Sequence, residues 1–435
     1  MTAAKPLVSK LVETEPHATM SEASSTLLPA SAAALSPAVT QPSAGHLHIS
    51  VQRETTYDLL RPSRRVFDPE EGMLADVVAG RPVFFVVDRT IHQLYGREID
   101  FYAQARLHVA GTLICNSSES GKTLRNVELI CEAAHGVGLR RDGIIVAVGG
   151  GITLDLAGFA AACFRRGIGY VRVPTTLIGL VDVAVGIKQG VNAFGSKNIL
   201  GAFYPPLATV LDYGFLETLS LPALSSGFAE ILKMAVIRDE ALLRLVEQHG
   251  RSLIDSGYRH PQTAGRQIAE RAELLMAEEL AGNLYESCLA RLVDFGHTFS
   301  PVIETASQYT ISHGEAVAID MLLSTSIAAQ RGVCSTSFFD RLVRIVGHLG
   351  LPLWPDRMPT VSQLAGSLVA VILHRGGALN LVAPQEAGVA TFLQNVSTAE
   401  VEIAVRDLKR SAGVHVPGPL KRDTQEIGSH AGFGL

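Results

Sequence analysis

The sequence is poor in charged and aromatic residues. Charged residues make up 18% of the 435 residues and aromatic residues 6%, with a single tryptophan. The net charge of −5 leaves no excess of basic side chains, so we expect no nucleic-acid partner, which would require a basic face. No uninterrupted apolar run reaches the roughly 18 residues that a membrane span needs, so we expect no membrane partner either.

Cysteine is also scarce. The five cysteines, Cys115, Cys131, Cys163, Cys288 and Cys334, are scattered and odd in number, and no two of them form a CxxC pair. This pattern favours reduced thiols in a cytoplasmic protein.

The chain has ample apolar residues and length. Hydrophobic residues make up 47% of the chain, and its length favours two domains with large cores. Residues 1–45 are rich in Ala, Ser, Pro and Thr and lack both a compact apolar segment and a basic start. We therefore interpret them as a disordered extension and not as a signal peptide. Residues 414–435, with Gly, Pro and mixed charges, are predicted to be a flexible tail.

Residues 46–215 alternate between strand and helix patterns. PVFFVVD (Pro82–Asp88) and GIIVAVGGG (143–151) are typical of buried parallel strands, and GYVRVPTTL (169–177) of a further strand. Helical patterns separate them, as in TLRNVELICEAAHGVG. The order predicts an α/β domain with a doubly wound, Rossmann-like parallel sheet.

The pattern becomes almost entirely helical after about Leu219. SSGFAEILKMAVIRDEALLRLVEQHG and TAEVEIAVRDLKR have helical periodicity, and ALNLVAP is a possible short strand. We predict a mainly helical second domain over residues 216–413, with the active site between the two domains.

Two glycine-containing segments suggest a nucleotide site. GGGITLD (Gly149–Asp155) follows a strand and opens a helix, where backbone amides favour a pyrophosphate; a simple tight turn is the alternative. Asp88 ends a strand and could bind a ribose hydroxyl or merely cap the next helix. NSSESGKT (Asn116–Thr123) does not fit the P-loop pattern, so it is either a ligand loop or a solvated loop.

Three lysines lie in segments otherwise poor in charge. Lys188 is in IKQGVN, Lys197 in GSKNILG and Lys233 in AEILKMA. Lysines beside glycine and asparagine suit a phosphate, although each alone could be a surface lysine.

One carboxylate and two imidazoles form a candidate metal set. Glu230 shares a helix face with Lys233, His297 is in VDFGHTFSP, and His313 is in ISHGEA. Such a set leaves an open position on Zn²⁺ or a similar divalent ion, although fourteen histidines also allow a chance trio.

Seven segments in this order resemble the sugar-phosphate cyclase superfamily, whose best-known member is 3-dehydroquinate synthase. They are GGGITLD, RVPTTLIGLVD, KQGVN, SKNILGAF, AEILKMA, DFGHTF and SHGEA. The resemblance covers roughly Pro82 to Pro384. It implies a Rossmann-like NAD-binding domain followed by a helical metal-binding domain.

The resemblance also assigns expected roles. It implies NAD contacts from Asp88, Glu119, Lys122, Gly150, Gly151, Asp155, Thr175, Thr176, Asp182, Lys188, Lys197 and Asn198. It implies that Glu230, His297 and His313 hold Zn²⁺ or Co²⁺. Substrate contacts are expected from Lys197, Asn198, Arg291 and Asp182, and catalytic roles for Lys188, Lys233, Asp294 and His374. A homodimer is expected from the family.

The family chemistry implies a small sugar phosphate as the substrate and NAD as a recycled cofactor. A hydroxyl is oxidised transiently, phosphate leaves by β-elimination, the hydride returns, and an intramolecular aldol reaction closes the ring. The net reaction is that of a lyase, with the metal polarising oxygen atoms.

Departures from the 3-dehydroquinate synthase pattern concern the substrate. Asp294 replaces an asparagine, Pro301 stands where a second histidine is usual, and an arginine expected at position 290 is displaced to Arg291. A pair of lysines near the end is replaced by HRGG, which begins at His374.

These changes resemble the cyclases of sedoheptulose 7-phosphate. Among those, the 2-epi-5-epi-valiolone synthases are similar to this chain at Leu280, Asp294 and His374. A 2-epi-valiolone synthase, a gadusol-type synthase, 3-dehydroquinate synthase itself, an oxidoreductase of the glycerol-dehydrogenase type and a non-catalytic relative are the alternatives.

Overall fold

The computed structural model describes residues 38–43, 46–51, 54–374 and 376–414. Residues 1–55 and 56–435 are two separate units. In the first unit, β1 (Ala38–Ser43) pairs antiparallel with β2 (His46–Ser50). The rest of the expected extension, residues 1–37 and 44–45, and most of the expected tail, residues 415–435, lie outside the described residues.

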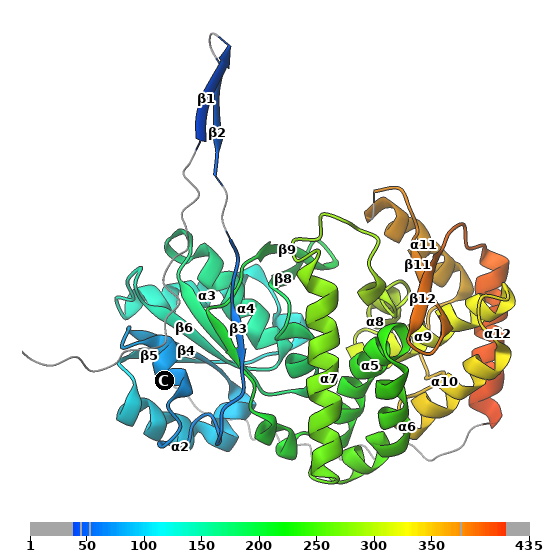
Figure 1. The fold of residues 1–435 in the computed structure, drawn as a ribbon, viewed down its shortest axis with the longest axis horizontal. Helices are drawn as coiled ribbons and strands as arrows, with labels where there is room; N and C mark the ends of the chain where they lie inside the picture. The colour runs from blue at the N-terminus through cyan, green and yellow to red at the C-terminus, as the bar shows by residue number, and fades with distance from the viewer. Residues whose placement is uncertain (1–37, 44–45, 52–53, 375, 415–435) are drawn as a thin grey trace, which may run out of the picture. The chain divides into compact units, whose positions relative to one another are not determined.

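The second unit begins with a six-stranded parallel sheet (Figure 1). The order across the sheet is β3 (Asp58–Leu60), β10 (Ala208–Val210), β7 (Gly169–Pro174), β6 (Ile144–Gly149), β4 (Val83–Asp88) and β5 (Val109–Cys115). The chain runs outward from β4 to β5 and then continues on the other side of β4 with β6. In such sheets the carboxyl ends at this reversal form the usual ligand crevice. The predicted doubly wound sheet is confirmed.

Helices cover both faces of the sheet because the central strands are apolar on both sides. Phe85 of β4 packs with α1 (Met73–Val78) and α2 (Arg89–Arg106), whereas its neighbour Phe84 packs with α3 (Leu124–Gly136) and α4 (Gly151–Cys163). Successive side chains of a strand point to opposite faces, so a continuous apolar run requires a cover on each side.

The segment between β7 and β10 contains structure that the sequence did not predict. It contains a π-helical turn, η3 (Gly179–Val183), and an antiparallel hairpin of β8 (Lys188–Ala193) and β9 (Ser196–Phe203). The hairpin packs on α4 and carries two of the three lysines singled out above. Four short 3₁₀ turns complete the irregular structure: η1 (Glu119–Gly121), η2 (Phe164–Arg166), η4 (Tyr213–Thr218) and η5 (Leu292–Asp294).

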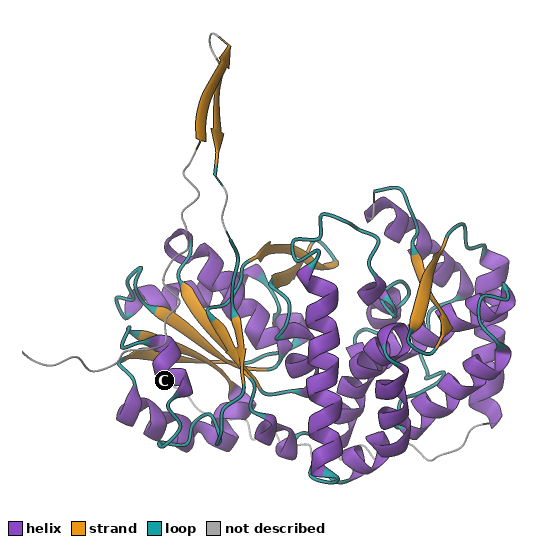
Figure 2. Ribbon diagram, viewed as in Figure 1, coloured by secondary structure: helices purple, strands orange, loops and turns teal. Residues whose placement is uncertain are grey.

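From Leu221 onward the chain is mostly helical (Figure 2). The helices are α5 (Leu221–Arg238), α6 (Glu240–Asp255), α7 (Gln262–Ala281), α8 (Ser300–Ala306), α9 (His313–Gln330), α10 (Thr336–His348), α11 (Val361–His374) and α12 (Thr398–Val414). The predicted short strand is β11 (Leu381–Glu386), which pairs antiparallel with β12 (Val389–Leu393).

Helices α5 and α9 form the centre of this helical part. They pack against each other, and 14 of the 18 residues in each are buried. A helix that is apolar all round is stable only in such a core. No helix among the described residues is long and apolar enough to cross a membrane. The domain boundary proposed at residues 215 and 216 stays a prediction, since residues 56–435 form one unit.

Candidate metal and nucleotide site

The structure brings Glu230, His297 and His313 together. Glu230 lies in the middle of α5, His297 follows η5, and His313 is the first residue of α9. Their candidate ligand atoms all lie within 4.8 Å of one another. The Glu230 side chain is 0% exposed, whereas those of His297 and His313 are 30% and 36% exposed. A ligand can therefore approach from the imidazole side.

The two imidazole rings present the same nitrogen to Glu230. Nδ1 of His297 lies 3.1 Å from the carbonyl oxygen of Phe295, and Nδ1 of His313 lies 3.1 Å from Oε1 of Glu304. Both partners are acceptors, so in each neutral ring Nδ1 carries the proton and Nε2 keeps its lone pair. The two Nε2 atoms lie 3.9 and 3.1 Å from Oε1 of Glu230.

The carboxylate of Glu230 fits a metal ligand. Both of its oxygens are buried and have no hydrogen-bond partner among the described residues. Lys233 Nζ lies 2.7 Å from Oε2, but this ion-pair contact is not aligned as a hydrogen bond. A buried carboxylate without hydrogen bonds is costly unless a cation completes it. One carboxylate and two imidazoles are a donor set that Zn²⁺ and Co²⁺ accept.

Electrostatics within the site are strong. Burial disfavours a charge on His313, yet without a bound metal ion the carboxylates of Glu230 and Glu304 on either side raise its pKa to about 10, so a metal ion would have to displace the Nε2 proton. Burial opposes the charge on Lys233 as well, but Glu230 and Asp182 raise the pKa of this ammonium. Lys233 Nζ lies 3.4 Å from Oδ1 of Asp182. The site therefore has a fixed ammonium beside the candidate metal ligands.

A second charged group lies next to the metal set. Lys188 Nζ lies 2.6 Å from Oε1 of Glu286, and the Arg291 guanidinium contacts both Glu286 and Asp294. The Lys188 side chain is 57% exposed, so its ammonium is accessible. The carbonyl oxygen of Asp294 accepts from the backbone N–H of His297 at 3.0 Å, so Asp294 is part of the same turn as this ligand.

Part of the expected nucleotide set lies at the carboxyl ends of β4, β6 and β7, whereas Glu119 and Lys122 follow β5 and the others lie in η3 and the hairpin. Gly150 and Gly151 open α4, whose first turn has no side-chain cap, and Thr175 and Thr176 directly follow β7. The Thr175 hydroxyl is buried, and no residue in the described part of the chain hydrogen-bonds to it. Uncapped helix amides, close glycines and an unsatisfied hydroxyl fit a dinucleotide pyrophosphate.

Two acids in this region already have partners. Asp88 Oδ1 accepts from the N–H groups of Thr90 and Ile91, so Asp88 caps α2 as the alternative interpretation held. Asp155 lies 2.5 Å from Lys122 Nζ, and its burial raises its pKa against the effect of that ammonium. Their roles toward a nucleotide stay predictions.

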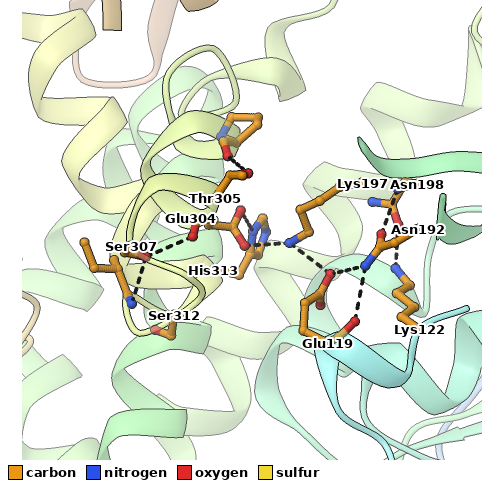
Figure 3. A network of polar contacts seen from close by, with 12 residues as sticks. Glu119, Lys122, Asn192, Lys197, Asn198, Glu304, Thr305, Ser307, Ser312 and His313 are labelled. Atoms are coloured by element: carbon orange, nitrogen blue, oxygen red, sulfur yellow. Dashed lines mark hydrogen bonds and ion pairs between the residues drawn. The ribbon is translucent and has the colours of Figure 1, made fainter. Parts of the chain in front are cut away.

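A polar network joins the nucleotide side to the metal set (Figure 3). Lys197 Nζ lies 2.6 Å from Oε2 of Glu304 and 3.3 Å from Oε1 of Glu119. Asn198 accepts from Lys122 through Oδ1 at 2.7 Å. Lys197 and Asn198 of β9 thus lie between the two groups of predicted residues.

One predicted site residue is not placed. His374 is the last residue of α11, and its side chain is outside the described residues. Pro301 lies in the first turn of α8, where its ring supplies no acid or base.

Sequence reasoning missed three buried or partly buried residues around the site. Glu304 and Glu286 contact predicted residues but lie in no motif of their own. Arg172 is fully buried on β7 and donates to the carbonyl oxygens of Val183 and Gly186, both at 2.7 Å. The one available signal was a charged residue within an otherwise apolar run, as in VRVP and PVIETA.

Comparisons with known proteins agree with this architecture. Residues 112–226 match the family model of the 3-dehydroquinate synthase N-terminal part, and residues 227–369 match that of the C-terminal part. The chain is 42% identical over 340 residues to a 2-epi-5-epi-valiolone synthase of Streptomyces glaucescens, covering 78% of this chain and 87% of that one. It is 32% identical over 370 residues to a demethyl-4-deoxygadusol synthase of Trichormus variabilis, covering 83% and 90%.

One solved structure is similar along nearly its whole length. It is a 2-epi-5-epi-valiolone synthase of Streptomyces hygroscopicus subsp. jinggangensis with NAD⁺ and Zn²⁺ bound. The TM-score is 0.79 at 36% identity, and the match covers 83% of this chain and 99% of that chain.

Proposed function

The chain belongs to the 3-dehydroquinate synthase family, and from this premise we propose that it is a sugar-phosphate cyclase that converts sedoheptulose 7-phosphate into 2-epi-5-epi-valiolone and phosphate. Because phosphate leaves in the net reaction, the enzyme is a carbon–oxygen lyase acting on phosphates. The relatives named 2-epi-5-epi-valiolone synthase support this choice by their higher identity, 42% against 32% for the gadusol-type relative.

The observation that carries the proposal is the position of Asp294. Its backbone is hydrogen bonded to His297 and its carboxylate lies 2.5 Å from the Arg291 guanidinium. A guanidinium already neutralised by Asp294 and Glu286 is a poor partner for a substrate carboxylate. Sedoheptulose 7-phosphate has no carboxylate, whereas the dehydroquinate precursor has one. The charge balance therefore favours the seven-carbon ketose phosphate.

The proposed cofactors are NAD and one divalent ion, Zn²⁺ or Co²⁺. Glu230, His297 and His313 would hold the ion, and the amides at the start of α4 would hold the pyrophosphate of NAD. When bound, the ion polarises hydroxyl and carbonyl oxygens, and the nicotinamide accepts one hydride and returns it.

The chain's own residues bind and orient the sugar phosphate. Lys188 is exposed and its ammonium is available to the phosphate once Glu286 releases it. Lys233 is held by Glu230 and Asp182, so its ammonium has a fixed position from which it can donate to a substrate hydroxyl. The Asp294 carboxylate accepts hydrogen bonds and thereby orients the polyol chain. Pro301 has no side-chain base that could accept a proton, so the departing phosphate itself takes the proton from the carbon next to the transient ketone as its C–O bond breaks.

The test is incubation of the purified protein with sedoheptulose 7-phosphate, NAD⁺ and Zn²⁺ or Co²⁺. We expect phosphate release at the same rate as formation of a cyclitol, identified by NMR, with no net accumulation of NADH. The dehydroquinate precursor should release no phosphate under the same conditions. Failure to release phosphate from sedoheptulose 7-phosphate with either metal would contradict the proposal.

Two further outcomes separate the alternatives. Net formation of NADH would indicate an oxidoreductase. In the NMR spectrum, a stereoisomer of the expected cyclitol would indicate a 2-epi-valiolone synthase, and a ring of different constitution would indicate a gadusol-type synthase. Asp294→Ala should lower kcat/KM at least about tenfold, or change the product, because one substrate-orienting hydrogen bond contributes roughly 1.4 kcal/mol or more. Asp142→Asn, at an exposed position far from Asp294 in the sequence, is the control.

A homodimer and a cytoplasmic location remain predictions.

A further inference from the structure

The two histidines of the metal set are held in different ways. His297 is fixed by a carbonyl oxygen of its own turn, that of Phe295. His313 is fixed by the side chain of Glu304, which comes from a different helix, α8. A carboxylate that accepts from Nδ1–H orients the ring and makes Nε2 a better donor to a metal. Only for His313 does this support depend on a side chain that has another partner.

The other partner of Glu304 belongs to the nucleotide side. The Glu304 side chain is 6% exposed; Oε1 faces His313 and Oε2 lies 2.6 Å from Lys197 Nζ. Lys197 is on β9, and its ammonium also lies 3.3 Å from Glu119. Figure 3 shows Lys197 reaching from the hairpin to a point between the two carboxylates.

The chain of contacts continues to the start of the nucleotide residues. Glu119 Oε1 accepts from Asn192 Nδ2 at 2.8 Å, and Asn192 Oδ1 accepts from the backbone N–H of Asn198 at 2.9 Å. Glu304 has one oxygen for each of its two neighbours, whereas Oε1 of Glu119 is shared between Asn192 and Lys197. A shift of Lys197 would therefore move the Glu304 carboxylate and change the hydrogen bond that it accepts from His313.

We propose that Glu304 is a positioning residue that couples occupancy of the metal site to binding of NAD, through the contacts Glu119–Lys197–Glu304–His313. The proposal rests on the proposed function for the identity of the two ligands. A metal ion bound through Nε2 would strengthen Nδ1–H of His313 as a donor to Glu304. Glu304 would then hold Lys197 in place beside the residues predicted to bind NAD. Coupling between two binding sites is reciprocal, so NAD must raise metal affinity by the same factor.

The test measures affinities, not turnover. NAD⁺ is titrated by calorimetry into metal-free and Zn²⁺-loaded full-length protein, and Co²⁺ is titrated with and without NAD⁺ by its d–d absorption. We expect Zn²⁺ to tighten NAD⁺ binding between about 5-fold and 150-fold, the usual range of such coupling. Reciprocity holds for one metal at a time, so NAD⁺ should tighten Co²⁺ binding by the factor with which Co²⁺ tightens NAD⁺ binding, and it should shift the Co²⁺ spectrum.

Two variants separate positioning from simple support of the fold. Glu304→Gln keeps the shape but removes the charge, so metal affinity should fall about 10-fold to 100-fold and the coupling factor should fall to near 1. Lys197→Met leaves the contact between Glu304 and His313 in place. It should abolish coupling while metal affinity without NAD⁺ stays within about 3-fold of the parent protein, because the ligand's own support is intact.

The control is Asp88→Asn, which lies at the end of β4 outside this chain of contacts. It should change NAD⁺ affinity equally with and without metal. A coupling factor of 1 in the parent protein, or an unchanged factor in both Glu304→Gln and Lys197→Met, would overturn the proposal. The outcome is independent of the cyclase assay: coupling without phosphate release refutes the proposed activity alone, and phosphate release without coupling refutes this inference alone.

Discussion

The carboxylate of Asp320 lies 2.7 Å from the backbone nitrogen of Thr298, the residue that follows the candidate ligand His297. The same oxygen, Oδ2, also accepts from the next two backbone N–H groups, at 2.5 and 2.8 Å. Asp320 is fully buried on α9, the helix that His313 begins. One carboxylate thus fixes the turn of one metal-set histidine to the helix of the other.

Replacing Asp320 by alanine should destabilise both the fold and the metal set. Three buried N–H donors would lose their acceptor, at about 1–3 kcal/mol each, so we expect the free energy of unfolding to fall by about 3 kcal/mol or more. Zinc affinity should fall as well because the turn of His297 loosens. Urea denaturation of the metal-free protein and zinc titration against a chelator measure the two effects.

The controls for this prediction are Asp320→Asn and Ser324→Ala. Asparagine keeps one acceptor oxygen, so the loss should be smaller than with alanine. The Ser324 hydroxyl donates to the other oxygen, Oδ1, at 3.1 Å, and its removal should cost about 1 kcal/mol. An alanine variant at 320 as stable as Ser324→Ala would contradict the assignment.

Much of the α/β part follows from local pattern. Strands such as VFFVVD and IIVAVG are apolar on both sides, and only a parallel sheet covered on both faces can bury them. The hairpin of β8 and β9 was not predicted, because KQGVNA and SKNILGAF mix lysine, asparagine and glycine without alternation. The hairpin packs on α4, so its strands depend on tertiary contacts and local propensity gives no signal.

The site divides in the same way. The metal set was predictable because its motifs resemble a known family, whereas Glu304 was not, since its two partners lie nine residues and 107 residues away along the chain. Such contacts exist only after α8, α9 and β9 have assembled. For Asp88 the difficulty is different. An acid at the end of a strand can bind a ribose or cap a helix, and the sequence alone does not distinguish these two roles.

Gly314 should tolerate no side chain. A Cβ at this position would lie 2.2 Å from the carbonyl oxygen of Ser226 on α5. Because this oxygen belongs to the backbone, the clash can be relieved only if one of the two helices moves. Gly314→Ala should therefore push the start of α9 away from α5, separate His313 from Glu230 and lower both stability and zinc affinity. Thermal unfolding with and without zinc measures the effect.

Gly366 is the matched control for Gly314. It lies within α11, and a Cβ there meets nothing within 4 Å. Gly366→Ala should raise stability by up to about 1 kcal/mol through helix propensity alone. If both alanine variants bind zinc like the parent protein, the close contact between α5 and α9 does not position the ligands.

Glu400 should make the fold sensitive to acid. The Arg331 guanidinium, 2.6 Å away, and the Ser397 N–H hold the pKa of Glu400 at about 2, below its usual 4.5. A carboxylate with a lowered folded-state pKa adds stability above its unfolded pKa and loses it as the pH falls from about 4.5 toward 2. The full effect is up to about 3 kcal/mol, less the screening by solvent at this partly exposed pair.

Urea denaturation between pH 2.5 and 7 would check this prediction, with Glu400→Gln flattening the low-pH part of the curve. Glu402→Gln, an exposed acid on the same helix, is the control. Any loss of metal at low pH affects both variants equally. Identical pH curves for the two variants would refute the role of Glu400.

Arg172 should position the turn that leads to Lys188. Its guanidinium is fully buried and donates to the carbonyl oxygens of Val183 and Gly186 and to the Tyr170 hydroxyl, each at 2.7 Å. Arg172→Met fills a similar volume but leaves these acceptors unsatisfied. We expect the free energy of unfolding to fall by at least about 2 kcal/mol.

The same change should also weaken substrate binding. Lys188, the first residue of β8, lies only two residues after Gly186, whose carbonyl oxygen accepts from Arg172. The KM for sedoheptulose 7-phosphate should rise by about tenfold if one charge-assisted phosphate contact is misplaced. Arg172→Lys keeps the charge but has fewer donors, so its KM and its free energy of unfolding should lie between those of the parent protein and of Arg172→Met. Arg125→Met, at an exposed position, serves as the control. A less stable Arg172→Met protein with an unchanged KM would show that this guanidinium supports the fold and does not position Lys188.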